Sequence, residues 1–268
     1  MLSSLVQRKL HAMRTETSAG HTAAVVREAL TDELRRARAR GVEEPRVVDV
    51  GGGSGAWAVP FAAAGCLVTV VDPNPNALAT LRRRAQEEGV GERITVVADD
   101  SDALGVRVPA GSADLILAHG LLEVVDDPRR AAEALATALA PAGALSVLVA
   151  NRYAAVLQRA LAGRFAEARG LLEAPEGVLR ADGETMLRRF GRRELEELMS
   201  AVGLWVSSVR GDGVVSDVVA DRESESRRDE TDWDAELREF EEVAVAVPEL
   251  RDIASRMHVL ARPAAVGA

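Results

Sequence analysis

The chain has 268 residues, of which 47% are hydrophobic and 28% charged, and its formal net charge is −9. This length and apolar content are sufficient for one large domain with a buried core. No apolar run reaches the roughly 18 residues of a membrane span, and charged residues interrupt the first twenty positions. We therefore expect a cytoplasmic protein. The acidic balance disfavours DNA or RNA as a general partner, since nucleic-acid binders usually carry a basic surface.

Cysteine and histidine usage argues against structural metals and disulfides. Cys66 is the only cysteine, so it has no partner within the chain. The four histidines, His11, His21, His119 and His258, are widely separated and lack the spacing of metal ligands. We expect no bound metal.

The first half of the chain predicts alternating helices and strands. Apolar residues at helical spacing predict an amphipathic helix over 21–40. The predicted strands that follow are 46–50, 67–72, 94–100, 112–120 and 144–151, and the helices between them are 56–65, 76–89 and 127–141. This alternation is typical of an α/β protein with a doubly wound, mostly parallel sheet of the Rossmann-like type.

The alternation ends after Asn151. Two short helices are expected within 152–190, followed by a helix over 191–203, a strand over 204–211, a helix over 233–246 and a strand over 255–263. Seven strands result, and the seventh can insert beside the sixth as an antiparallel strand. We expect one domain over 1–268, with an N-terminal helical segment (1–45), a cofactor-binding core (46–151) and substrate-side insertions at 152–190 and 212–255.

A glycine-rich segment, VVDVGGGSG at 47–55, follows the first strand directly. Glycine loses more backbone entropy on folding than other residues, so four glycines here require a reason. In an open α/β sheet, ligands bind beyond the carboxyl ends of the strands, and a loop without side chains lets a ligand approach the backbone. Gly51, Gly52, Gly53 and Gly55 are therefore predicted to bind a ligand. Together with Ala56, the glycines (GGGSGA, 51–56) also satisfy the dinucleotide fingerprint G-x-G-x-x-[GA], so NAD is an alternative.

Acidic residues lie within or at the ends of the first three predicted strands and indicate an adenosine-containing ligand. Asp72 ends the second strand, where a carboxylate can bind both ribose hydroxyls. Asp49 lies two residues before the glycines, where dinucleotide enzymes usually carry an apolar residue. Asp100 and Ser101 follow the third strand, where their side chains can reach an adenine. Asp72 fits NAD and S-adenosylmethionine equally, while the other acids favour the latter.

These three motifs, DVGGGSG, VVD and VADDS, resemble those of the class I S-adenosylmethionine-dependent methyltransferases. The resemblance covers residues 46 to 151 and includes HGLLEVVDDPRRAAEALATALAPAGAL. Across the whole chain, VREAL near Arg27, LAHGLLEVVDDPR around His119, ALAGRF at 160–165 and MHVLARP at 257–263 are similar to the tRNA 5-carboxymethoxyuridine methyltransferases. This resemblance implies a methyltransferase with S-adenosyl-L-methionine as cofactor.

The resemblance also implies roles for individual residues. Arg27 binds the methionine carboxylate of the cofactor beside Gly51 and Gly52, Asp72 holds the ribose, and Asp100 and Ser101 hold the adenine. His119 lines the cofactor pocket. Asn151, Arg152 and Tyr153 follow the fifth strand and are weaker candidates for contacting the acceptor.

The acceptor stays open between a small molecule and a tRNA. Residues 210–219 read RGDGVVSDVV, where the tRNA-modifying family carries basic and aromatic residues. The segment APEGVLRADGE, near 175–185, stands where a lysine-rich stretch is expected from the resemblance. The chain lacks the [ND]-P-P-Y motif of enzymes that methylate the amino groups of DNA bases, so DNA is not expected. A nicotinamide-dependent oxidoreductase and a non-catalytic methyltransferase-like binding protein are the alternative functions, and no catalytic residue is assigned.

Overall fold

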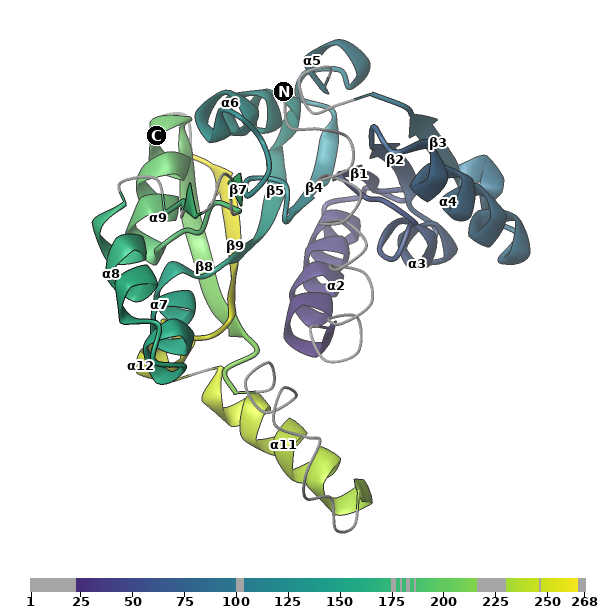
Figure 1. The fold of residues 1–268 in the computed structure, drawn as a ribbon. Coiled ribbons are helices and arrows are strands. Elements are labelled where there is room, and N and C mark those ends of the chain that lie inside the picture. The colour runs from purple at the N-terminus through teal and green to yellow at the C-terminus, as the bar shows by residue number, and fades with distance from the viewer. Residues whose placement is uncertain are drawn as a thin grey trace.

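The computed structural model describes residues 23–99, 104–174, 177–178, 180–181, 184–185, 187–215, 230–245 and 247–264. Its centre is a seven-stranded sheet in the order β3-β2-β1-β4-β5-β9-β8 (Figure 1). The strands are β1 (Arg46–Val50), β2 (Leu67–Val71), β3 (Ile94–Val97), β4 (Ala113–His119), β5 (Leu139–Ala150), β8 (Leu204–Asp212) and β9 (Arg256–Pro263). Strands β1 to β5 pair in parallel, and β9 runs antiparallel between β5 and β8. The predicted doubly wound, mostly parallel sheet is confirmed, including its inserted seventh strand.

Helices cover both faces of the sheet. Helices α2 (Ala23–Ala39), α3 (Ala58–Ala63) and α4 (Pro75–Glu87) pack on one face, and α5 (Leu104–Arg107), α6 (Pro128–Ala138) and α9 (Arg192–Ala201) pack on the other. Two apolar clusters, one on each face, form the core. Alternate residues of β4 and β5 contribute to opposite clusters, as expected for strands buried on both faces.

The structure corrects several predicted boundaries. Strand β5 begins at Leu139 rather than residue 144, so α6 ends at Ala138 and is shorter than predicted. Gly143 allows this extension, because a Cβ atom there would lie 2.7 Å from the carbonyl oxygen of Ala113 on β4. The 152–190 segment contains the two expected helices, α7 (Arg152–Leu161) and α8 (Phe165–Glu173). It also contains an unpredicted hairpin, β6 (Arg180–Ala181) and β7 (Glu184–Thr185).

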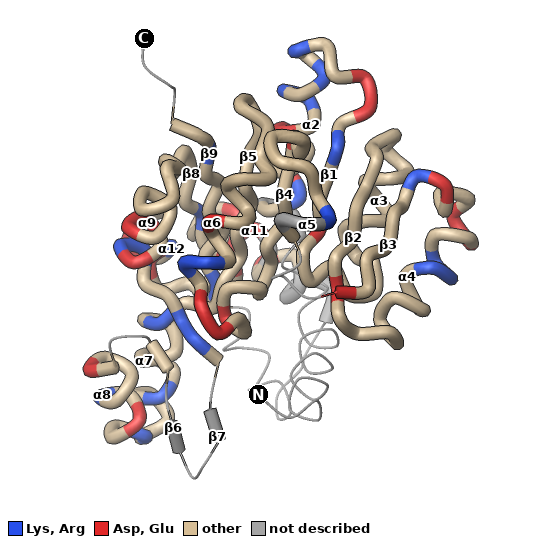
Figure 2. Tube along the Cα trace, turned by 90° about the horizontal axis from the view of Figure 1, so that it is seen from above, with Lys and Arg blue, Asp and Glu red and all other residues tan. Residues whose placement is uncertain are grey.

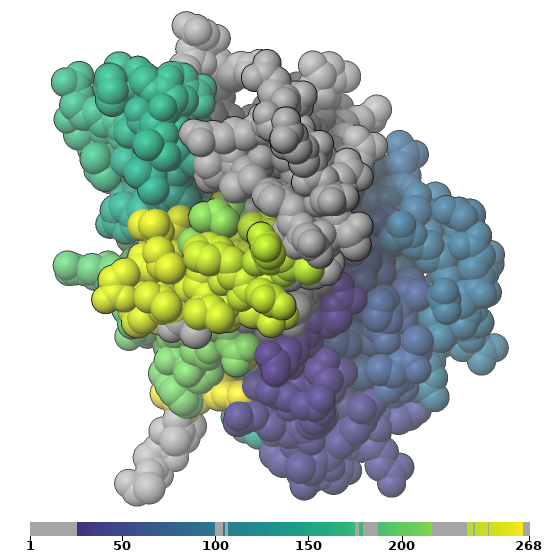
Figure 3. Space-filling view, turned by 90° about the horizontal axis from the view of Figure 1, so that it is seen from below, coloured from purple at the N-terminus to yellow at the C-terminus, as the bar shows by residue number. Residues whose placement is uncertain are grey.

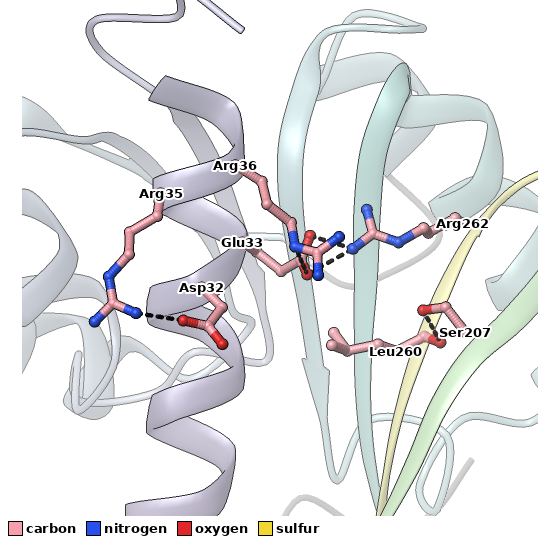
Figure 4. Close-up of polar contacts among 7 residues, drawn as sticks. All are labelled: Asp32, Glu33, Arg35, Arg36, Ser207, Leu260 and Arg262. Carbon is pink, nitrogen blue, oxygen red and sulfur yellow. Dashed lines mark hydrogen bonds and ion pairs between the residues drawn. The ribbon is translucent and has the colours of Figure 1, made fainter. Parts of the chain in front are cut away.

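An ion pair attaches α2 to β9, in the antiparallel part of the sheet. Glu33 is buried, and both of its carboxylate oxygens lie 2.6 Å from the guanidinium of Arg262 at the end of β9 (Figure 4). Arg36, one turn along α2, approaches the same carboxylate at 3.8 Å. Helix α2 is thereby fixed against β9, with its first turns extending toward the carboxyl ends of the parallel strands.

Three sets of helices surround the carboxyl edge of the sheet. Figure 3 views the molecule from below Figure 1 and shows, on this side of its surface, α7 with α8 in teal, α11 (Glu230–Ala244) with the short α12 (Pro248–Arg251) in yellow-green to yellow, and α2 in purple. Helices α7, α8, α11 and α12, which interrupt the alternation of strands and helices, therefore lie at the edge where open α/β sheets bind their ligands.

Within the described residues, none of the helices combines the length and the apolar character that crossing a bilayer requires. The same part of the chain contains no cluster of three or more histidine, cysteine or acidic side chains that could hold a metal ion. Positive and negative residues are interspersed along the described trace (Figure 2).

Candidate functional site

The glycine loop turns sharply at the carboxyl end of β1 and passes over a buried acid. The Gly51 amide donates a 2.7 Å hydrogen bond to the carbonyl of Val71 at the end of β2. A Cβ atom on Gly52 would lie 2.5 Å from Cγ of Asp49. Gly55 has φ +81°, and a Cβ there would lie 2.2 Å from Leu81 of α4. The loop therefore needs glycine both for its conformation and for its close packing.

Asp72 ties the end of β2 to the glycine loop. Its side chain is buried, and one carboxylate oxygen accepts a 2.9 Å hydrogen bond from the Gly53 amide. The other oxygen accepts a 2.7 Å bond from the amide of Asn74, the N-cap residue of α4. The cap of α4 is the Asn74 side chain, which accepts the amides of Asn76 and Ala77, while Asp72 holds the backbone that leads into it. The predicted ribose contact of Asp72 stays a prediction.

Asp49 is a buried carboxylate beneath the loop. Its exposed fraction is 2%, and Oδ2 has no hydrogen-bond partner among the described residues. Burial, and secondarily the negative charge of Asp72, raises the pKa of Asp49 to about 7. Removing a carboxylate from water without a partner disfavours its charged form. The site therefore has an unsatisfied acid that a cationic group would stabilise.

Arg27, Trp57 and His119 converge beside this loop from three different elements. Trp57 follows the glycines and is the N-cap residue of α3. The guanidinium carbon of Arg27, on α2, lies 5.6 Å from the Trp57 ring centroid. The His119 ring, at the end of β4, meets Trp57 edge-on with centroids 5.4 Å apart. The structure thus brings the predicted Arg27 and His119 together through Trp57, which is not among the predicted site residues.

The remaining predicted site residues divide into two groups. Asp100 and Ser101 lie outside the described residues. Asn151, Arg152 and Tyr153 lie at the carboxyl end of β5, as expected, but two of these side chains have structural partners. The Asn151 amide donates to the carbonyls of Asp252 and Ala254, and its oxygen accepts from the Tyr153 amide. Arg152 pairs with Glu194 at 2.9 Å. Their predicted contact with the acceptor stays untested.

Comparison with known proteins identifies the family. A family model described as "Methyltransferase domain" matches residues 22–209, which is more than half of the chain. The chain belongs to this methyltransferase family. The predicted class I S-adenosylmethionine-dependent methyltransferase is confirmed at the level of the family, and S-adenosyl-L-methionine is the cofactor of that family.

Individual relatives match part of the chain. It is 32% identical to tRNA 5-carboxymethoxyuridine methyltransferase of Escherichia coli (strain K12) over 150 residues, 54% of this chain and 56% of the relative. It is 33% identical to a ubiquinone biosynthesis O-methyltransferase of Cupriavidus pinatubonensis over 112 residues, 42% and 44% of the two chains. The matches thus span about half the length of these curated relatives.

A solved structure supports the fold over nearly the whole chain. The 1,6-didemethyltoxoflavin-N1-methyltransferase of Burkholderia thailandensis, with bound 1,6-didemethyltoxoflavin and S-adenosylhomocysteine, superposes with a TM-score of 0.56. The superposition covers 97% of this chain and 86% of that one, at 19% sequence identity. At this identity the likeness establishes the fold and leaves the acceptor open.

Proposed function

We propose that this protein transfers a methyl group from S-adenosyl-L-methionine to a small molecule or to a modified nucleoside of tRNA. One observation carries the proposal: the carboxylate of Asp49, with Oδ2 unsatisfied among the described residues, lies directly beneath Gly52. The methionine end of the cofactor carries an ammonium group. This group can approach the glycine backbone closely and act as the cationic partner of the Asp49 carboxylate. The buried carboxylate and the glycine loop therefore fit the methionine end of this cofactor.

Each group around the loop has a part in this proposal. Asp49 attracts the ammonium, and Arg27 binds the carboxylate of the same methionine end. Asp72 binds the ribose hydroxyls while its hydrogen bond to the Gly53 amide holds the loop in place. Asp100 and Ser101 bind the adenine, and His119 and Trp57 border the reacting end.

The cofactor, when bound, supplies a methyl group activated by a positively charged sulfur. The chain's own task is to hold the two reactants in line and to exclude water. A carboxylate or thiolate acceptor needs no general base. A hydroxyl or amine acceptor benefits from one, and among the predicted site residues His119 is the candidate.

The relatives favour two classes of acceptor. One matching relative is named for a modified uridine of tRNA, and another for ubiquinone biosynthesis. We propose that the segments 152–190 and 212–255 select between these classes, because loops at the carboxyl edge of a sheet vary with the ligand. Both segments lie outside the glycine-loop core.

A methyl-transfer assay tests the proposal. Purified protein is incubated with methyl-labelled S-adenosylmethionine and either tRNA from cells that lack this protein or a panel of small carboxylic acids and phenols. We expect label in tRNA or in one small-molecule class, and no label with the Asp72→Ala variant. Cofactor binding without label in any arm would contradict a methyltransferase acting on these classes and support the non-catalytic alternative.

A further inference from the structure

Three hydrogen-bonded polar side chains run across the sheet face that α2 covers, from the candidate site on β4 through β5 to β9. The His119 Nε2 atom at the end of β4 lies 2.8 Å from the Ser146 hydroxyl on β5. The same hydroxyl lies 2.8 Å from Nε2 of His258 on β9. The two imidazole centroids are 6.1 Å apart with their planes at 88°. The rings therefore meet at one shared hydroxyl rather than stacking.

This trio lies in an apolar environment. Ser146 is fully buried and His258 is 1% exposed. On the same face of the sheet lie the buried Leu117 and Leu148, together with the apolar side of α2. Burying a hydroxyl and an imidazole is unfavourable unless their hydrogen bonds are made. A hydrogen-bonded network in such an environment favours one geometry over its alternatives.

The single hydrogen of the Ser146 hydroxyl limits which nitrogen of each imidazole ring carries a proton. The Ser146 hydroxyl has one hydrogen and two lone pairs, so in principle it can also accept from both rings. Among the described residues its only partners are the two imidazoles, and a buried O–H needs an acceptor, so it donates to one ring and accepts from the other. Each neutral imidazole carries one N–H. If both short bonds are made, one ring is protonated at Nε2 and the other at Nδ1. The hydroxyl thus couples the tautomer of His119 to that of His258.

We propose that Ser146 and His258 are positioning residues that hold the His119 ring beside Trp57 in a single tautomer. The consequence for methyl transfer rests on the proposed cofactor site, because His119 matters only if it borders that site. The hydrogen-bond coupling itself does not depend on a ligand. Neither Ser146 nor His258 was predicted from the sequence to act in the site.

The charge state of His258 is consistent with this role. Burial, and secondarily the positive charge of Arg210 on the neighbouring strand β8, lowers the pKa of His258 to about 3. His258 is therefore neutral near neutral pH and keeps one N–H to share. A neutral partner fixes the tautomer of His119 without placing a charge in the core.

Long-range proton–nitrogen NMR of the imidazole rings tests the proposal in the full chain. Spectra are recorded without ligand at pH 8, above the ordinary histidine pKa of about 6.5, and His119 and His258 are assigned from His→Asn variants. We expect two single tautomers of opposite type, one Nε2–H and one Nδ1–H. Two rings of the same type, or a mixture of tautomers at His119, would overturn the proposal.

Variants add the functional readout. Ser146→Ala is expected to give a tautomer mixture at His119 and to weaken S-adenosylhomocysteine binding by about threefold to tenfold, the range of one lost hydrogen bond. Ser146→Thr, which keeps the hydroxyl, is expected to restore the wild-type ring signals. Ser207→Ala is the matched control, because its hydroxyl bonds the Leu260 carbonyl on the same sheet and is not part of the trio.

The outcomes separate this inference from the proposed function. Single complementary tautomers without S-adenosylhomocysteine binding in the wild type would retain the trio and reject the cofactor site. Normal binding in Ser146→Ala with unchanged ring signals would reject the positioning role and retain the cofactor site.

Discussion

Gly52 lies directly over the carboxylate of Asp49, so that a Cβ atom at position 52 would stand 2.5 Å from Asp49 Cγ and 2.5 Å from Oδ2. The two residues are therefore interdependent: the buried acid fits only beneath a residue without a side chain. Because Oδ2 has no partner among the described residues, this pair combines a close-approach surface with an unsatisfied negative charge. Both properties suit a ligand with a small cationic end.

Replacing Gly52 with alanine tests the close approach. The new methyl group must displace Asp49 or the loop, which we expect to lower the free energy of unfolding by about 1–3 kcal/mol. S-adenosylhomocysteine affinity should fall at least about tenfold, a change of about 1.4 kcal/mol. Calorimetry and chemical denaturation measure the two effects. Gly91→Ala is the control, since a Cβ there meets nothing within 4 Å. Wild-type affinity in Gly52→Ala would show that the ligand does not approach the loop.

Asp49→Asn tests the buried charge through the pH dependence of stability. The pKa of Asp49 is about 7 in the folded protein against an ordinary value of 3.8. Between these two values the folded state binds the proton more tightly than the unfolded state, so this group reduces stability as the pH rises. Without cofactor, the asparagine variant should therefore have a higher Tm than the wild type at pH 8. Each kcal/mol of added stability corresponds to about 2–4 °C in Tm. The difference should shrink toward pH 5.

The same variant should bind cofactor less well, because the ammonium loses its anionic partner. In the wild type, a cation beside Asp49 favours the charged form, so S-adenosylhomocysteine affinity should rise between about pH 6 and pH 8 with release of a proton. Calorimetry in buffers of different ionisation enthalpy detects that proton. Equal pH profiles of Tm and affinity for the two proteins would contradict the account.

Asp127, the N-cap residue of α6, is a control that separates the holding of backbone amides by Asp72 from ligand binding. Both carboxylates accept backbone amides next to a helix start: Asp72 from Gly53 and Asn74, and Asp127 from Arg129 and Arg130. Asp127→Ala should lower the free energy of unfolding by about 1 kcal/mol and leave cofactor affinity unchanged. Asp72→Ala should additionally abolish measurable S-adenosylhomocysteine binding. If both variants bind equally well, Asp72 serves only to hold the backbone of the loop and of Asn74.

The pairing of Glu33 with Arg262 should matter more than an exposed ion pair. Glu33→Gln leaves the partly buried Arg262 without its anionic partner, so we expect a loss of about 2 kcal/mol in the free energy of unfolding. Glu87→Gln removes the exposed Arg83–Glu87 pair and should change stability by less than about 0.5 kcal/mol. Urea denaturation compares the two. Similar losses would show that the α2 attachment depends on apolar packing alone.

The sequence was sufficient for the parallel half of the sheet because local signals agree there. An apolar β-branched run before the glycine loop, and an acid at the end of the next strand, predict β1 and β2 with nearly the observed bounds. The placement of Asp72 near the loop follows from the parallel pairing of these strands. Such features depend on residues close together in the chain.

Long-range contacts were not predictable in the same way. Ser146 and His258 are 112 residues apart, and they meet only because β9 inserts between β5 and β8. Trp57 gave a usable signal, since it lies two residues after Gly55, but its contact with His119 depends on the pairing of β1 with β4, which are distant in the chain. The hairpin β6–β7 has only two residues in each strand, too few for a periodic pattern.

Calorimetric titration of the wild-type protein with S-adenosylhomocysteine, and separately with NAD, shows directly which of the two binds at the glycine loop. We expect one site with a Kd on the order of micromolar for S-adenosylhomocysteine, no heat from NAD, and loss of binding in Asp72→Ala. Heat from NAD together with none from S-adenosylhomocysteine would contradict the cofactor assignment at the glycine loop.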